Sequence, residues 1–163
     1  TESGAPVAGA AVNAINPGLF PGVSSIRLAS DAEGRVTYFV HPSASHQCFV
    51  VSSPGLARLF FAASPKEEEQ AVVLPAAGGT LVVRPGELKE GEVRLLWKDA
   101  CYLSIGLLNG LTRGDGTKFT GLGAGTYRLC RHTVGSGRPA EGVCSSGYLD
   151  RYGFLELALP ASR

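Results

Sequence analysis

The sequence contains no methionine, and it has no uninterrupted apolar run of about 18 residues, which is what a membrane-spanning helix needs. It also has no Cys-x-x-Cys pair of the kind found in zinc sites, and no Gly-x-Ser-x-Gly elbow for a nucleophilic serine. Only 18% of the residues are charged and the formal net charge is +1, so the clustered Lys and Arg that bind phosphate are lacking. We therefore expect no transmembrane segment, no bound metal or other cofactor, no catalytic centre and no nucleic-acid partner.

What the sequence does have is turn residues and short apolar runs. Among its 163 residues are 22 Gly and 10 Pro, while apolar residues make up 44%. The apolar runs are shorter than a typical helix and rich in β-branched and aromatic residues, and several alternate with polar residues in the two-residue period of a strand. These patterns predict an all-β fold with strands at residues 10–15, 26–30, 35–40, 47–52, 56–62, 70–74, 80–84, 92–97, 126–131, 147–149 and 154–159.

Two of these predictions are more specific. Residues 26–30 and 35–40 are expected to pair as a hairpin, because the sequence between them, Asp31-Ala-Glu-Gly34, is a tight turn. Residues 101–108 are either a further strand or a short helix.

The stretch that organises the second half is residues 119–132. Three glycines at alternate positions within residues 121–125 form a turn, because glycine enters positive φ without steric cost. The strand that follows carries Cys130, and Cys144 lies beyond a loop rich in Gly, Ser and Pro. We predict that these two cysteines form a disulfide across a hairpin, which is worth about 3 kcal/mol in the chain-entropy model.

The other two cysteines, Cys48 and Cys101, lie one in each half of the chain. They are either a bridge between the halves or two buried thiols, because four cysteines allow three pairings and the sequence does not choose among them. Disulfides persist in oxidising compartments, so we predict an extracytoplasmic location in the periplasm, at the cell surface or among secreted proteins. His41, His46 and His132 lack the spacing of metal ligands, and we expect them to be surface residues.

The strand pattern restarts at residues 75–79, which read Pro-Ala-Ala-Gly-Gly. Each side of this point carries a set of short strands at close spacing, which is typical of a β-sandwich. We therefore predict two domains, residues 1–76 and residues 77–163, arranged as tandem antiparallel sandwiches.

Three motifs in the first half resemble those of the carboxypeptidase regulatory-like domain: Gly4-Ala-Pro-Val-Ala-Gly-Ala-Ala-Val12, Ser30-Asp-Ala-Glu-Gly-Arg-Val36 and Ser52-Ser-Pro-Gly55. The second half carries a weaker likeness in Gly125-Thr-Tyr-Arg-Leu129, which is similar to the strand entry of that family. The resemblance implies an immunoglobulin-like or transthyretin-like sandwich of seven strands. The carboxypeptidases that often carry this domain use a His-x-x-Glu zinc motif elsewhere in their chains. This sequence lacks the motif, so the resemblance implies a module without the catalytic part.

The sequence departs from the family at its beginning. The family usually has a strand before the Gly-x-Pro opening, whereas this chain starts at Thr1. A sandwich without its first strand exposes unpaired backbone groups and the apolar face beneath them. We expect either that upstream sequence supplies the strand or that another chain adds it by β-augmentation.

The candidate binding residues are the aromatic residues Tyr148, Tyr152 and Phe60. Tyr148 and Tyr152 flank a turn, so they either lie on an exposed rim that contacts a protein or a sugar, or pack in the core. Adjacent strand residues point to opposite faces, so one of Phe60 and Phe61 points outward, and we expect the neighbouring domain or another chain to cover it. We predict a non-catalytic structural or protein-interaction module of a larger bacterial envelope protein or assembly, with a carbohydrate-binding module as the alternative.

Overall fold

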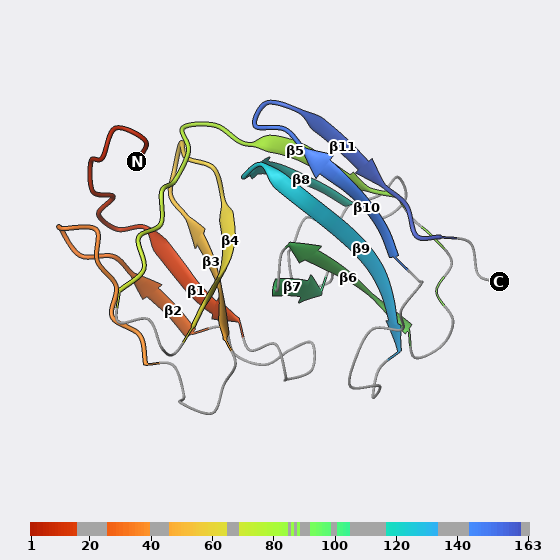
Figure 1. Cartoon of the computed structure of the whole chain (residues 1–163), viewed down its shortest axis with the longest axis horizontal. Coiled ribbons are helices and arrows are strands. Elements are labelled where there is room, and N and C mark those ends of the chain that lie inside the picture. Colours follow the sequence, from red (N-terminus) through yellow and green to blue (C-terminus); the bar gives the residue numbers. More distant parts are fainter. Residues whose placement is uncertain are drawn as a thin grey trace.

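The computed structural model describes residues 1–15, 26–39, 46–64, 69–84, 86, 88, 92–98, 101–104, 117–133 and 144–160. Strands β1 to β11 follow one another along these residues, and the described part of the chain contains no helix (Figure 1). The prediction of an all-β fold is therefore confirmed. The predicted division at residue 76 falls between β4 and β5.

The first half forms one four-stranded antiparallel sheet, which we call the first-half sheet. Its spatial order is β2-β1-β3-β4, and its strands are β1 (Ala11–Ile15), β2 (Ile26–Ala29), β3 (Gln47–Ser52) and β4 (Leu59–Ala63). Because side chains alternate along each strand, one face of this sheet carries a cluster with a core of Ala10, Val12, Ala14, Phe49, Val51 and Leu74. In the described residues this half has a single sheet rather than two facing sheets.

The second half forms two sheets that pack face to face. A four-stranded sheet has the order β10-β9-β6-β7, and a three-stranded sheet has the order β11-β5-β8. All pairs are antiparallel except β11 with β5, which are parallel. The strands are β5 (Gly79–Val83), β6 (Glu92–Lys98), β7 (Cys101–Ser104), β8 (Thr117–Leu122), β9 (Gly125–Thr133), β10 (Cys144–Leu149) and β11 (Phe154–Leu157).

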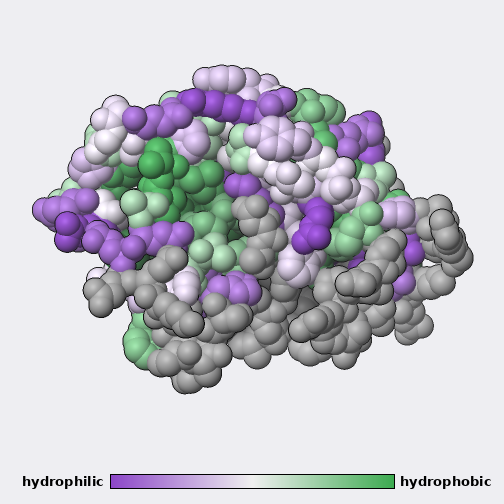
Figure 2. Space-filling model, viewed as in Figure 1, coloured by the Kyte–Doolittle hydropathy of each residue, from purple (hydrophilic) through white to green (hydrophobic). Residues whose placement is uncertain are grey.

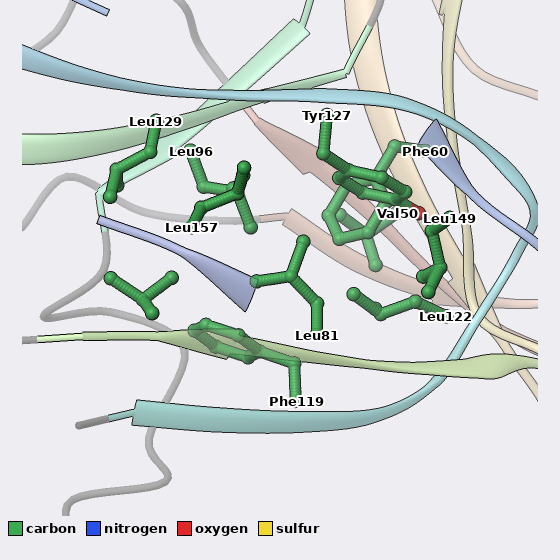
Figure 3. Close-up of a cluster of buried hydrophobic side chains, with 11 residues drawn as sticks. Val50, Phe60, Leu81, Leu96, Phe119, Leu122, Tyr127, Leu129, Leu149 and Leu157 are labelled. Atoms are coloured by element: carbon green, nitrogen blue, oxygen red, sulfur yellow. The ribbon is translucent and has the colours of Figure 1, made fainter. Parts of the chain in front are cut away.

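The core of the second half extends into the first half. Val50 of β3 and Phe60 of β4 are buried in the same cluster as Leu81, Tyr127 and Leu149 of the second half (Figure 3). The side chains of Val50 and Phe60 project from the face of the first-half sheet opposite to the one carrying Phe49. The two halves are thus joined by a shared apolar cluster and not only by the connecting chain.

Backbone contacts reinforce this junction. Arg58 forms an isolated parallel bridge with Leu122: the Arg58 amide donates to the Gly121 carbonyl at 2.6 Å and the Gly123 amide donates to the Arg58 carbonyl at 2.8 Å. A Cβ atom at Gly123 would overlap Leu59 Cδ2 and force that side chain to move, so glycine allows the close approach of this turn to β4.

Two of the predicted strands do not form, although the structure describes residues 35–39 and 70–74. β2 pairs with β1 and not with residues 35–39, which lie outside the sheets, so the predicted 26–40 hairpin does not form. Residues 70–74 likewise belong to no strand. The Asp31 to Gly34 turn does form, and its Gly34 amide donates to the Asp31 carbonyl at 3.1 Å. Residues 101–104 are a strand, and residues 105–108 lie outside the described part.

Tyr127 is fully buried at the point where the chain turns from β8 into β9. Its hydroxyl donates a hydrogen bond of 2.7 Å to the carbonyl oxygen of Gly123, four residues earlier. A tyrosine that bonds back to the backbone at such a corner is the tyrosine-corner arrangement of immunoglobulin-like sandwiches. The bond ties the turn to the strand that follows it.

We expect Tyr127→Phe to lower the free energy of unfolding by about 2 kcal/mol, because the buried Gly123 carbonyl oxygen loses its donor while the ring stays in place. The urea midpoint measures this loss. Tyr152→Phe is the matched control, since Tyr152 is 78% exposed and the change should stay within about 0.5 kcal/mol. Equal stability of the two variants would show that the Tyr127 bond contributes nothing.

Candidate interaction surface

Both pairs of cysteines form disulfides in the structure. Cys130 and Cys144 lie directly opposite each other on β9 and β10, with their Cα atoms 4.1 Å apart, which confirms the predicted hairpin disulfide. Cys48 on β3 is bonded to Cys101 on β7, with Cα atoms 5.6 Å apart, so of the two alternatives the bridge between the halves is the one found. Both of these latter residues are buried.

Phe60 does not present a surface. Its side chain is only 4% exposed and packs against the core of the second half. The adjacent Phe61 points to the other face, where its ring stacks on Phe49 at 5.2 Å between centroids. The neighbouring half of the same chain therefore covers Phe60, and this side chain is not available to a separate chain.

Tyr148 and Tyr152, by contrast, are exposed to 62% and 78%, and Phe154 beside them is exposed to 65%. We call these three residues the aromatic tip, because they lie in and beside the turn between β10 and β11, two strands that belong to different sheets. Sequence reasoning missed Phe154. The signal is present in the sequence, because Leu155 and Leu157 share one face of the predicted strand at residues 154–159 and alternation directs Phe154 to the other face.

The strand register separates the three rings around the tip. Leu149 of β10 is buried between the sheets, so its neighbour Tyr148 projects from the outer face of the four-stranded sheet. Leu155 lies opposite the buried Leu81 of β5, so Phe154 projects from the outer face of the three-stranded sheet. Tyr152 lies in the turn between them. The tip thus carries aromatic rings on both sides, which suits insertion into a recess rather than contact with a flat surface.

Packing and backbone bonds hold the connection between β10 and β11 in place. The Gly153 amide donates to the Asp150 carbonyl at 3.0 Å, and the Thr80 amide of β5 donates to the Gly153 carbonyl at 2.9 Å. A Cβ atom at Gly147 would lie 2.5 Å from Leu155 Cδ1, so glycine at this position lets β10 and β11 approach closely. The aromatic rings are therefore presented from an anchored element.

An ion pair links the tip to the beginning of the chain. The Arg151 guanidinium donates to the Glu2 carboxylate, and the same guanidinium lies 5.4 Å from the centre of the Tyr152 ring. The hydrogen bond from Arg151 lowers the pKa of the Glu2 carboxyl and raises the pKa of Arg151. Because the folded pKa of Glu2 is lowered, any stabilisation by this pair is present above the ordinary carboxyl range and is lost as the pH falls through the lowered value.

A second group of side chains lies on the outer face of the four-stranded sheet. Trp97 of β6 is opposite Arg128 of β9, whose guanidinium lies 5.8 Å from the indole ring, and Arg128 is opposite Ser146 of β10. Tyr148 follows two residues after Ser146 and therefore shares this face. An aromatic ring beside polar donors is the arrangement that a sugar-binding surface uses.

Within the described residues, no three side chains among His, Cys, Asp and Glu are close enough together to hold a metal ion. His46 precedes β3 and His132 lies near the end of β9, while His41 falls outside the described residues. The described part also contains no helix that is long and apolar enough to cross a bilayer. No protein-family model, curated protein or solved structure matches the chain.

Proposed function

We propose that the chain is a non-catalytic binding module that holds a protein partner at the aromatic tip. The observation that carries the proposal is the exposure of Tyr148, Tyr152 and Phe154 on a turn whose flanking residues are anchored, since Leu149 is buried and Leu155 packs against the core. Aromatic residues of this kind are enriched where proteins bind one another, and a few of them supply most of the binding energy. The two disulfides support a location outside the cytoplasm, within a larger envelope protein or a multi-subunit assembly.

The mechanism of such a module is rigid presentation. Affinity is lost when flexible side chains and loops must be ordered on binding, and a preorganised turn reduces that cost. The shared core, the bond from β5 to the turn and the Cys130–Cys144 disulfide all fix the position of the tip before a partner arrives.

The combined variant Tyr148→Ser, Tyr152→Ser, Phe154→Ser tests this proposal. A photo-crosslinking residue placed at position 152 in the native assembly is expected to label one polypeptide. Affinity for that polypeptide is then expected to fall at least about 100-fold in the variant, since two lost hot-spot contacts of about 1.4 kcal/mol each already give that factor. Thermal stability should change little, because the three side chains are exposed.

The matched control is Ile26→Ser with Phe39→Ser, which removes exposed apolar side chains from the first half, where they are 51% and 77% exposed. Affinity should stay within about threefold of the unmodified protein. An equal loss of affinity in the control and the test variant would contradict the proposal, because binding would then depend on apolar surface in general.

The second candidate function is carbohydrate binding, and the row formed by Trp97, Arg128 and Ser146 beside Tyr148 favours it. A glycan array distinguishes the two functions. Binding of a sugar that is lost in Tyr148→Ser and in Arg128→Ala, with no crosslinked polypeptide, would replace the protein partner by a carbohydrate.

A further inference from the structure

The two halves contain the same four-stranded sheet. In the first half β1 pairs with β2 and β3, and β3 pairs with β4. In the second half β6 pairs with β7 and β9, and β9 pairs with β10. The pairs are antiparallel in every case, so β1, β2, β3 and β4 correspond in order to β6, β7, β9 and β10.

The layer that covers this sheet is complete only in the second half. There β5 lies in the centre of the covering sheet, with β8 on one side and β11 on the other. In the first half the chain crosses over the sheet at the corresponding points: residues 35–39 follow β2 as β8 follows β7, and residues 69–76 follow β4 as β11 follows β10. No strand in the described part of the first half corresponds to β5.

The two crossing segments look like strands that lack a partner. Val36 and Tyr38 pack toward the first-half cluster while Thr37 and Phe39 are exposed, and in the second segment Leu74 is buried while Val73 is 54% exposed. This is the side-chain alternation of a strand. Among the described residues, however, neither segment takes part in a β-ladder, so their backbone groups have no strand to pair with.

The described residues cover the apolar face beneath them incompletely. Around the buried core of the first-half cluster, they leave a ring of partly exposed apolar side chains, namely Val7, Leu28, Val36, Tyr38, Leu56, Leu59, Phe61 and Ala63. Figure 2 shows apolar surface over the first half, on the left of the view, with polar side chains above it and to its left. Over the corresponding sheet of the second half, β5 places Leu81 and Val83, both 0% exposed.

We propose that this face binds an extended segment of a second polypeptide, which takes the place that β5 takes in the second half. Because β5 is antiparallel to β8 and parallel to β11, the incoming strand runs antiparallel to residues 35–39 and parallel to residues 69–74. It carries apolar residues at alternate positions, since one of its faces lies on the cluster. This site is separate from the aromatic tip and does not depend on it.

Charge at the ends of the site adds to the description of the partner. Asp31 and Glu33 are exposed beside the start of residues 35–39, and Glu69 is exposed at the start of the other segment, which lies at the opposite end of the site. Arg35 is the cation beside Asp31 and Glu33. Among the described residues at these ends the carboxylates outnumber this cation, so basic residues flanking the apolar stretch of the partner fit both ends.

The beginning of this chain does not fill the site in the structure. Residues 1–5 fold back on themselves: the Gly4 amide donates to the Thr1 carbonyl at 3.0 Å, and the amino group of Thr1 donates to the Ala5 carbonyl at 2.8 Å. The chain then packs on the cluster at Val7, beside Gly34, and at Ala10, while the Glu2 carboxylate accepts from the Ala76 amide at 3.5 Å.

A peptide carrying residues 79–84 between two added lysines is the probe, because it copies β5 and has the basic flanks. Amide exchange of the full chain, measured residue by residue with NMR, is expected to slow about tenfold at residues 36–38 and 72–74 when the peptide is present at ten times its Kd. A nitroxide at the amino end of the peptide is expected to broaden the amide signals of Phe39 and Gln70 more strongly than those of Arg35 and Leu74.

Two altered peptides provide the control. Asp in place of the residues equivalent to Leu81 and Val83 removes the face that would lie on the cluster, and we expect no protection. Asp in place of the residue equivalent to Val82 changes only the outward face, and we expect protection to persist.

Four results would overturn the proposal. Slow exchange at residues 36–38 and 72–74 without peptide would show that the chain covers its own face, and the same protection appearing only with rising protein concentration would assign it to a second copy. Protection confined to the edge strands β2 or β4 would place the peptide elsewhere. No protection with any peptide would leave the face without a strand-binding role.

Discussion

The double variant Cys48→Ala, Cys101→Ala is expected to lose about 4 kcal/mol of unfolding free energy, because its disulfide closes the larger of the two loops. The bonded residues are 53 positions apart, and the chain-entropy model assigns about 4 kcal/mol to a loop of that size. The corresponding variant Cys130→Ala, Cys144→Ala spans 14 positions and is expected to lose about 3 kcal/mol. Urea unfolding monitored by the single Trp97 and by circular dichroism measures both losses.

The comparison between the two double variants tests whether the Cys48–Cys101 disulfide stabilises the junction between the halves. Removal of Cys48–Cys101 also takes away the covalent link between β3 and β7, so the two halves are then joined only by the shared cluster and the connecting chain. A smaller loss for this variant than for Cys130→Ala, Cys144→Ala would contradict the account of the junction between the halves.

Phe60→Ala is expected to lower the free energy of unfolding by about 4 kcal/mol, the usual cost of removing a buried phenylalanine ring from a core. Phe60 lies in the cluster that contains Leu81, Tyr127 and Leu149, so the cavity opens at the junction of the two halves. Both halves should therefore lose stability together. Phe39→Ala is the control: this ring is 77% exposed, and the change should stay within about 0.5 kcal/mol.

The elements that the sequence predicted correctly are those determined by neighbouring residues. The glycines at 121, 123 and 125 predicted the turn between β8 and β9, and the alternation of residues 126–131 predicted β9 itself. The hairpin disulfide followed in the same way, because Cys130 and Cys144 flank one connecting loop. Local rules of turn and strand are sufficient for features of this kind.

Strand pairing depends on residues far apart in the sequence, and here the predictions failed. Residues 35–39 and 70–74 have the alternation of strands, yet no described strand pairs with them. The alternation records which side chains face the cluster, and it contains no information on whether a neighbour is available. For the same reason the sequence did not decide whether Cys48 and Cys101 are bonded to each other. Their pairing depends on how the first-half sheet packs on β7.

For the candidate site, the sequence singled out Tyr148 and Tyr152 but left open whether they are exposed or pack in the core, and the structure shows them exposed. The alternation of β11 contained the signal for Phe154. Phe60 shows the limit of this reasoning. Two adjacent phenylalanines in a strand imply that both faces of the sheet are covered, but the identity of the second covering layer is a property of the tertiary structure.

Rigid presentation of the aromatic tip depends on the two halves unfolding as one unit. Native-state amide exchange measures this cooperativity most directly. In the unmodified protein, the slowest amides of β3 and of β9 are expected to open with free energies that agree within about 0.5 kcal/mol, and Phe60→Ala should lower both by the same amount. Opening of β3 several kcal/mol more easily than β9, with β9 unchanged in Phe60→Ala, would show that the halves fold independently and would contradict the account.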